Sequence, residues 1–315
     1  MQPEKRPQAG RFLFFPALGL INEFGNSMNT SMEGQIIAAY GRQFTVELPD
    51  GVHVTCVTRG KKSGAACGDR VRIALTSPNQ GVIEAILPRQ SLLYRSDAFR
   101  EKIIAANVTQ IIIVLAAVPS FYEDLVNRCL VAAEAAKIKA LIVLNKADLV
   151  AETARAMETL QAYRNLGYPL LTLCAHRDIE PLRPFLKGET SVLVGQSGMG
   201  KSSIINGLFP GINLETREIS KTLDSGKHTT TFAKIYHLDP DSHIIDSPGL
   251  QEFGLHHLKP EEIDHAFIEF RPYLGQCKFN NCHHRSEPGC AVLAAVAAGS
   301  IHPRRLAAYQ KLVNA

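Results

Sequence analysis

One short segment, GQSGMGKS at residues 195–202, constrains the fold of this chain more than any other. It matches the pattern G-x-x-x-x-G-K-[ST], in which glycines allow backbone N–H groups to wrap around phosphates. An apolar segment precedes it and a helix-forming segment follows it, which is the strand–loop–helix context that such a loop requires. We therefore expect Lys201 to reach the β- and γ-phosphates of a nucleotide and the Ser202 hydroxyl to bind Mg²⁺. The predicted phosphate loop comprises Gly195, Gln196, Ser197, Gly198, Met199, Gly200, Lys201, Ser202 and Ser203.

A second nucleotide-binding pattern, Asn145-Lys146-Ala147-Asp148, lies upstream, at the end of the apolar segment LIVL. Ligands of open α/β sheets bind at this end of the strands. The Asp148 carboxylate is expected to accept hydrogen bonds from N1–H and the N2 amine of guanine, and adenine would leave it unpaired, so discrimination is on the order of 10⁴-fold. Asn145 is expected to tie this loop to the phosphate loop, and the Lys146 stem to cover the base. The alternative, an ordinary surface turn, is disfavoured by the phosphate loop elsewhere in the chain.

Two further segments complete the predicted nucleotide site. Cys174-Ala175 ends the next apolar segment and stands where GTPases usually have Ser-Ala, whose backbone contacts guanine O6. HIIDSPG places Asp246 at the end of an apolar segment, with Gly249 three residues later. In this D-x-x-G arrangement we expect Asp246 to hold Mg²⁺ through water and the Gly249 amide to sense the γ-phosphate.

The order of these motifs is reversed relative to an ordinary GTPase, because the base-reading loops precede the phosphate loop. A circular permutation explains this order, since a compact domain tolerates new termini where the old ones lie close together. Apolar segments alternate with helical ones through the middle of the chain, so the expected fold is α/β, with a parallel sheet covered on both faces. The chain then leaves the domain directly after Gly249, which ties the following segments to the γ-phosphate sensor.

The segment GKHTTT at 226–231 lies between the two phosphate-binding motifs and is the predicted switch. Either Thr229 or Thr230 is expected to complete the Mg²⁺ shell in the triphosphate state. Leu250 stands where Ras-like GTPases carry a glutamine that orients the attacking water. Leucine cannot orient water by hydrogen bonding, so we expect slow intrinsic hydrolysis and take His228 as the candidate group that assists; a purely structural histidine is the alternative.

Three cysteines and two histidines cluster near the C-terminus in CKFNNCHHRSEPGC. The spacing Cys277-x₄-Cys282-x-His284-x₅-Cys290 offers three thiolates and one imidazole, the ligand set of a closed, structural zinc site. His283 is an alternative ligand to His284 on spacing alone. An odd total of seven cysteines with one tight cluster fits a reducing cytoplasm and a metal site better than a disulfide framework.

The N-terminal third differs from the rest of the chain in the length and spacing of its apolar segments. Residues 33–94 contain several short apolar segments at close spacing, separated by turns such as PDG, which predicts a small antiparallel barrel. An OB-fold is favoured because such barrels bind oligonucleotides on an open face. The expected regions are a flexible tail at 1–31, an OB-fold RNA-binding domain at 32–97, a circularly permuted GTPase domain at 98–258, and a zinc-knuckle and helical domain at 259–315.

The net charge of +4 is unevenly placed along the chain. Residues 32–102 hold 10 Lys/Arg and 7 Asp/Glu, residues 103–270 hold 15 and 20, and residues 271–315 hold 6 and 1. Basic flanks around an acidic middle point to a polyanionic partner, with an ordinary solvated basic face as the alternative. No run of 18 apolar residues occurs, so no membrane-spanning helix is expected.

The motifs NKADL, GQSGMGKSSIIN, GKHTTT, DSPGLQEFGL and C-x₄-C-x-H-x₅-C follow in that order. With them, the chain resembles the bacterial family of ribosome small subunit-dependent GTPases A over roughly residues 33–313. The resemblance implies hydrolysis of GTP to GDP with Mg²⁺, binding to the 30S subunit and its 16S rRNA in late maturation, and stimulation by that particle. It also implies His284 as the fourth ligand of one structural Zn²⁺ and a cytoplasmic location. Nothing in the sequence demands a dimer, so a monomer is expected. Cys174 and the first 31 residues depart from the family pattern.

Two other functions fit parts of the sequence. A nucleotide-gated RNA-binding module with incidental hydrolysis is compatible with Leu250 in place of glutamine. A P-loop kinase is compatible with the phosphate loop, but it leaves Asn145 and Asp148 without a role. GTP turnover with and without the ribosomal particle separates the first alternative from a GTPase, and a titration of ATP against GTP separates the second.

Overall fold

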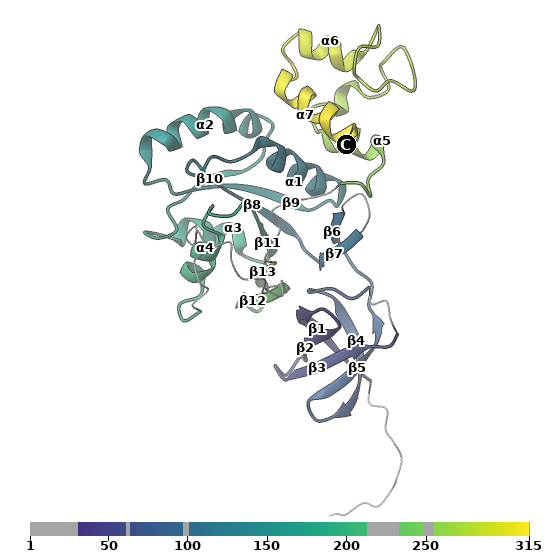
Figure 1. Cartoon of the computed structure of the whole chain (residues 1–315), viewed down its shortest axis with the longest axis vertical. Coiled ribbons are helices and arrows are strands. Elements are labelled where there is room, and N and C mark those ends of the chain that lie inside the picture. The colour runs from purple at the N-terminus through teal and green to yellow at the C-terminus, as the bar shows by residue number, and fades with distance from the viewer. Residues whose placement is uncertain (1–30, 61–63, 97–100, 213–232, 248–254, 315) are drawn as a thin grey trace, which may run out of the picture.

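The computed structural model of the chain describes residues 31–60, 64–96, 101–212, 233–247 and 255–314 (Figure 1). Four predicted site residues lie outside these ranges: His228, Thr229, Thr230 and Gly249. Residues 1–30 of the predicted tail lie outside them as well, while residue 31 already begins the first strand. No helix of the described part is both long and apolar enough to cross a membrane.

Eleven of the described strands form one continuous sheet, in the order β10-β9-β8-β11-β13-β12-β1-β2-β3-β5-β4. A separate hairpin pairs β6 with β7. The strands are β1 (Ser31–Tyr40), β2 (Gln43–Glu47), β3 (His53–Thr58), β4 (Arg70–Ser77), β5 (Gln80–Ile86), β6 (Leu92–Ser96), β7 (Glu101–Ala106), β8 (Gln110–Ala116), β9 (Lys139–Asn145), β10 (Leu170–Thr172), β11 (Thr190–Val194), β12 (Ala233–Asp239) and β13 (Ser242–Asp246).

In the described part of the chain all helices follow β8 (Figure 1). They are α1 (Glu123–Ala135), α2 (Val150–Asn165), α3 (Arg183–Leu186), α4 (Lys201–Leu208), α5 (Pro260–Ala266), α6 (Ala291–Ala297) and α7 (Pro303–Val313), with short 3₁₀ turns at Glu180–Leu182 and Arg271–Tyr273. Helices α5 and α7 begin at Pro260 and Pro303, where proline is favoured because at the first helical position it loses no helical hydrogen bond.

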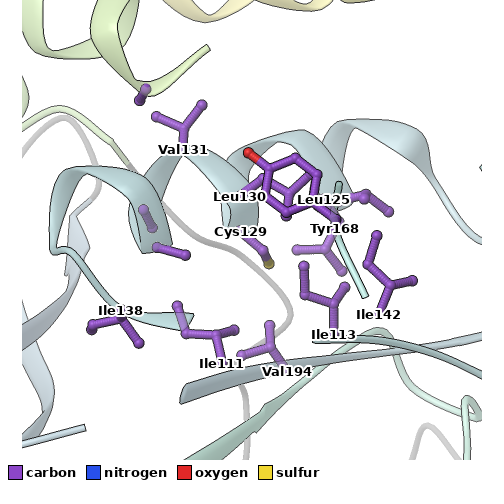
Figure 2. Close-up of a cluster of buried hydrophobic side chains, with 14 of the residues drawn as sticks. Ile111, Ile113, Leu125, Cys129, Leu130, Val131, Ile138, Ile142, Tyr168 and Val194 are labelled. Carbon is purple, nitrogen blue, oxygen red and sulfur yellow. The ribbon is translucent and has the colours of Figure 1, made fainter. Parts of the chain in front are cut away.

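The middle of the chain forms the expected parallel sheet, in which β10, β9, β8, β11 and β13 run in one direction. Strand β8 is buried along its whole length. Ile111 and Ile113 face α1, whereas the alternate residues Ile112 and Val114 join the cluster that contains α4. Figure 2 shows the first of these layers, with α1 lying over the sheet. Both faces of the sheet are therefore covered, which explains the unbroken apolar character of its strands.

The N-terminal strands close into a barrel, because β1 pairs with β2 along one half and with β4 along the other. The order β1-β2-β3-β5-β4, with β3 parallel to β5, is the Greek-key barrel of the predicted OB-fold. A register shift between Ile36 and Ala38 marks a bulge where β1 passes from one partner to the other. The barrel interior is filled by Ile36, Phe44, Val46, Val54, Val71 and Ile73, among others.

Barrel and parallel sheet are joined edge to edge, a feature that the sequence did not predict. Strand β1 pairs with β12 in antiparallel fashion at Ala38↔Lys234 and Ala39↔Ala233. Strand β12 in turn pairs with β13, which ends at Asp246. A single intervening strand therefore connects the barrel to the strand that carries a predicted Mg²⁺ residue.

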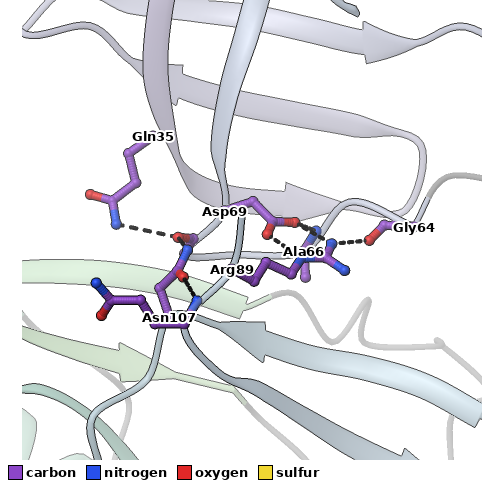
Figure 3. Close-up of polar contacts among 8 residues, drawn as sticks. Gln35, Gly64, Ala66, Asp69, Arg89 and Asn107 are labelled. Atoms are coloured by element: carbon purple, nitrogen blue, oxygen red, sulfur yellow. Dashed lines mark hydrogen bonds and ion pairs between the residues drawn. The ribbon is translucent and has the colours of Figure 1, made fainter. Parts of the chain in front are cut away.

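A buried polar network secures the chain that leaves the barrel, as Figure 3 shows. The Asp69 carboxylate is fully buried and accepts two hydrogen bonds from the Arg89 guanidinium, at 2.6 and 2.8 Å. Asn107 donates to the Gly68 carbonyl at 2.9 Å and accepts from the Gln90 amide at 2.9 Å. These bonds pin the segment after β5 and the entry to β8 to the same loop of the barrel.

The C-terminal helices pack on α1 and share one apolar core with the parallel sheet. Phe267, Phe270 and Tyr309 are the C-terminal aromatic residues of this core. At this interface Arg305 and Glu269 form a buried ion pair at 2.5 Å, and the Arg305 guanidinium lies 4.4 Å from the centre of the Phe267 ring. Arg305 also donates to Asn127 of α1. The C-terminal helices, which follow the D-x-x-G motif in the chain, are therefore fixed to α1, which covers one face of the parallel sheet.

Candidate nucleotide and metal sites

Asn145 holds three loops of the predicted nucleotide site together. It ends β9 and is almost fully buried. Its side-chain N–H donates to the Met199 carbonyl of the phosphate loop at 3.0 Å, and its Oδ1 accepts from the Ala175 amide at 3.1 Å. The first base loop (residues 145–148), the second base loop (residues 173–178) and the phosphate loop therefore meet at the Asn145 side chain. The sequence predicted that this side chain ties the first base loop to the phosphate loop.

Two glycines of the phosphate loop are required by close approach of neighbouring atoms. A Cβ at Gly200 would lie 2.2 Å from the Asn145 amide nitrogen, and the residue has a φ of +94° that favours glycine. A Cβ at Gly195 would lie 2.2 Å from the Val114 carbonyl oxygen of β8. Both positions therefore exclude side chains, and the loop can pass tightly between β8 and Asn145.

Lys201 lies inside the phosphate loop as the first residue of α4. Its ammonium group donates to the Gly195 carbonyl at 2.6 Å and to the Gln196 carbonyl at 2.8 Å. Burial lowers the pKa of Lys201 to about 8, and the negative charge of Asp246 partly opposes this shift. Burial raises the pKa of Asp246, and Lys201 acts in the opposite direction. The two groups predicted to face phosphate and Mg²⁺ are therefore electrostatic neighbours.

The predicted guanine reader is preorganised by its neighbour in the second base loop. Asp148 is exposed, and its carboxylate accepts a hydrogen bond from the Cys174 thiol at 3.2 Å. This bond is the main reason that the pKa of Asp148 is lowered. The predicted role of Cys174 involved only its backbone, so the thiol contact adds a function for the side chain. The Ala175 amide, predicted to meet guanine O6, donates to Asn145 in this structure.

Contacts from the loop between β8 and α1 complete the site and were missed in the sequence. Lys146 has a left-handed φ of +61°, and its ammonium donates to the Val118 carbonyl at 2.8 Å. The Tyr122 amide donates to the side-chain oxygen of Gln196 at 3.0 Å. Both bonds use backbone groups of the loop between β8 and α1. Every residue has such groups, so no pattern of side chains in the sequence predicts these bonds.

The remaining residues of the predicted phosphate loop lie between β11 and α4 or in the first turn of that helix. Ser202 and Ser203 occupy the first turn of α4, and the Ser203 hydroxyl lies 3.4 Å from Nε2 of His176 in the second base loop. Ser197, Gly198 and Met199 form the turn that leads into this helix.

The four cysteine and histidine residues predicted to bind metal form one compact group. The ligand atoms of Cys277, Cys282, His284 and Cys290 all lie within 4.8 Å of one another. His284 Nδ1 lies 3.6 Å from Sγ of Cys277, 3.6 Å from Sγ of Cys282 and 3.2 Å from Sγ of Cys290. These separations suit ligands around a small tetrahedral ion. His283, the alternative on spacing, is not a member of this group.

The backbone of the knuckle is arranged around these ligands. His284 is buried and adopts a left-handed φ of +55°, which turns its ring toward the cysteines. The Glu287 carboxylate accepts from the His283 amide at 2.9 Å and from the Arg285 amide at 2.7 Å. Gln310 of α7 donates to the His284 carbonyl at 2.8 Å, so the knuckle is also tied to the last helix.

A parallel α/β sheet whose base loop precedes and contacts its phosphate loop defines a P-loop protein of the circularly permuted GTPase class. The sequence profile of the RsgA GTPase family matches residues 86–256, so the chain belongs to this family. The proteins named small ribosomal subunit biogenesis GTPase RsgA from Nitrosospira multiformis and Nitrosomonas europaea are 57% and 53% identical to it. These alignments cover 90% of this chain in both cases, and 90% and 92% of the two relatives.

Solved structures agree with this assignment. The crystal structure of YjeQ from Thermotoga maritima matches with a TM-score of 0.71 at 31% identity, and covers 90% of this chain and 98% of that chain. YloQ, described as a circularly permuted GTPase, matches with a TM-score of 0.66 at 27% identity, and covers 93% and 97%. The predicted fold class, a permuted P-loop GTPase domain between an N-terminal barrel and a C-terminal Cys₃His region, is confirmed.

Proposed function

We propose that this protein is a GTPase that binds the 30S ribosomal subunit and hydrolyses GTP to GDP during late maturation of that subunit. The observation that carries the proposal is the Asn145 side chain, which bonds to both the phosphate loop and the second base loop. One guanine nucleotide can therefore contact all three loops. The names of the relatives, small ribosomal subunit biogenesis GTPase, support the ribosomal role and do not favour an RNA-binding module with incidental hydrolysis.

The roles of the nucleotide-binding residues follow from their chemistry. Asp148 reads guanine, the Lys146 stem covers the base, and Lys201 leaves the carbonyls of its own loop to neutralise the β- and γ-phosphates. Gly249 senses the γ-phosphate through its amide. The full proposed nucleotide set is Asn145, Lys146, Ala147, Asp148, Cys174, Ala175, Gly195, Gln196, Ser197, Gly198, Met199, Gly200, Lys201, Ser202, Ser203, Asp246 and Gly249.

Two metal ions belong to the proposal. Mg²⁺ accompanies GTP and is held by the Ser202 hydroxyl and, through water, by Asp246. Zn²⁺ fits the Cys277, Cys282, His284 and Cys290 group, because three thiolates and an imidazole are a zinc ligand set and leave no open position. The zinc ion is therefore structural, and it stabilises the knuckle that α7 holds.

For the hydrolytic step we assign His228 to the attacking water, and Thr229 or Thr230 to Mg²⁺. Support for His228 comes from the sequence alone: Leu250 has replaced the glutamine that orients water in Ras-like GTPases. We expect slow turnover by the free protein and faster turnover on the 30S particle.

The remaining parts of the proposal concern partners and organisation. The barrel at 32–97 and the knuckle region at 259–315 contact 16S rRNA, which their excess of Lys and Arg over Asp and Glu supports. The GTPase domain spans 98–258, and the tail at 1–31 carries no assigned role. We propose a cytoplasmic monomer without a membrane partner, because ribosomal subunits mature in the cytoplasm.

The deciding experiment measures GTP hydrolysis by the full chain with and without purified 30S subunits, at several salt concentrations. We expect strong stimulation that weakens steeply as salt rises, because phosphate contacts release counterions. A parallel titration compares GTP with ATP, and equal affinity would remove the guanine assignment. Hydrolysis that stays unchanged on adding 30S subunits would refute the ribosomal role while leaving GTP binding intact.

A further inference from the structure

A hollow of about 550 Å³ is lined by residues of the phosphate loop and by α1 with the residues before it, and the α1 wall has no role in the site described so far. One wall is formed by Gln196 and Ser197 of that loop, and the other by α1 and the residues before it, including Ser120 and Arg128. The Tyr122 amide bonds to the Gln196 side chain, so the start of α1 is fixed against the loop. The relative position of the two walls is therefore set by direct contact.

Arg128 is the only arginine or lysine among the residues that line this hollow, and it is half-buried. Asp124, one helical turn earlier, lines the same hollow and is the natural partner for its charge. That carboxylate instead pairs with Lys311 of α7. Arg128 forms no ion pair with any residue in the described part of the chain, so its half-buried side chain has no counter-charge among those residues. An anion that enters the hollow would stabilise such a group.

The position of the hollow indicates which anion this is. The Lys201 ammonium, which reaches the β- and γ-phosphates in loops of this kind, bonds to the carbonyls of Gly195 and Gln196. The hollow is lined by the same stretch of loop, at Gln196 and Ser197. It therefore lies beside the phosphate loop, and Asp148 of the base loop is not among its lining residues.

We propose that Arg128 is a catalytic residue that contacts the γ-phosphate of GTP during hydrolysis, an arginine supplied by the chain itself. The inference rests on the proposed GTPase function. In the reaction, the water oxygen forms a bond to the γ-phosphorus, and the bond from that phosphorus to the β–γ bridging oxygen breaks. The electron pair of the broken bond remains on the β-phosphate of GDP. One proton of the water stays on the attacking oxygen, and the other passes to another oxygen of the released phosphate. A guanidinium stabilises the charge on the equatorial oxygens during this transfer.

The test uses Arg128→Ala and Arg128→Lys in the full chain, with Arg155→Ala as the matched control. Arg155 is an exposed arginine on α2 and has no part in the site. Three quantities are measured: single-turnover GTP hydrolysis, GDP affinity, and assembly of the GDP–aluminium fluoride complex, which mimics the transferring phosphoryl group. We expect Arg128→Ala to slow hydrolysis by on the order of 10²-fold or more and to abolish the aluminium fluoride complex. GDP affinity and melting temperature should stay at wild-type values.

Each other outcome has a definite meaning. Hydrolysis within a fewfold of wild type in Arg128→Ala overturns the proposal. Parallel losses of GDP affinity and melting temperature in Arg128→Ala would identify a structural arginine and would also overturn the proposal. Partial rescue of hydrolysis by Arg128→Lys, with GDP affinity the same in both variants, supports the proposal. Absence of GTP hydrolysis in the wild-type and Arg155→Ala proteins would instead refute the proposed function.

Discussion

The side-chain amide of Asn145 donates to the main-chain carbonyl of Met199 at 3.0 Å, across a separation of 54 residues in the sequence. This one bond connects the loop that reads the base to the loop that wraps the phosphates. Both partners are buried, so separating the loops would leave a donor and an acceptor unpaired at a cost of about 1–3 kcal/mol each. The two loops therefore behave as one unit, although the chain reaches them in permuted order.

Asp148→Asn should change the base that the protein prefers. An asparagine amide cannot accept from both N1–H and the N2 amine of guanine, but it complements the carbonyl at position 2 of xanthine. We expect GTP affinity to fall by on the order of 10³-fold and XTP affinity to rise, as measured by calorimetric titration of both nucleotides. Asp178→Asn, the same change at an exposed position of the second base loop, serves as the control. Unchanged GTP affinity in Asp148→Asn would remove this residue from the base site.

Lys201→Met should stabilise the nucleotide-free protein near neutral pH. The pKa of Lys201 is about 8 in the folded chain, below its ordinary value of 10.5, so the fold disfavours the charged form. This penalty is complete below pH 8 and disappears as pH rises toward 10.5, where the unfolded chain also loses the proton. We expect a gain in unfolding free energy of up to about 3 kcal/mol at pH 7 that shrinks above pH 8.

The measurement for Lys201 is urea unfolding of the nucleotide-free protein from pH 7 to pH 10. Lys187→Met removes an exposed lysine and should leave the pH profile as in wild type. Lys201→Met should at the same time lose tight GTP binding, because the phosphates no longer meet a cation. A variant that is destabilised equally at every pH would show that the lysine stem, and not its charge, determines the effect.

Cys282→Ser should release the metal ion from the knuckle. We expect one zinc per chain in the wild-type protein by mass spectrometry of the metal content, and on the order of tenfold less in the variant, because serine is a poor ligand in place of a thiolate. His283→Ala is the matched control, since His283 lies next to the ligand His284 but outside the group. Metal-free wild-type protein, or equal zinc loss in the control, would contradict the assignment of the four ligands.

Much of the nucleotide site could be predicted because its chemistry depends on particular residue types at fixed spacing. Gly200 is a clear example: the loop has no room for a side chain next to Asn145, so the motif has to contain glycine there. The helix starts at Pro260 and Pro303 follow a similar local rule, because proline is suited to the first helical turn. Such signals are local and do not depend on the rest of the fold.

The features that the sequence did not predict depend on hydrogen bonds of backbone groups. The pairing of Ala38 with Lys234 uses main-chain hydrogen bonds at a sheet edge, and many sequences would permit it. The Tyr122–Gln196 contact likewise involves a backbone donor. The boundary between barrel and GTPase domain at 97/98 stays a prediction; the strands on either side of it, β6 and β7, pair with each other. Tertiary pairing across that position has no local sequence pattern.

Arg305→Met should destabilise the whole chain, because Arg305 and Glu269 form an ion pair whose side chains are only 3% and 4% exposed. Removing the arginine leaves the Glu269 carboxylate buried without a counter-charge, so we expect the unfolding free energy to fall by about 3–5 kcal/mol. Arg304→Met is the control, since Arg304 pairs with Glu123 at an exposed position and should cost at most about 1 kcal/mol. Urea unfolding monitored by circular dichroism gives both values. The double variant Glu269→Leu with Arg305→Met should recover most of the loss, because an apolar pair avoids the buried charge. A double variant as unstable as Arg305→Met alone would show that the bond from Arg305 to Asn127, and not the ion pair, fixes the C-terminal helices to α1.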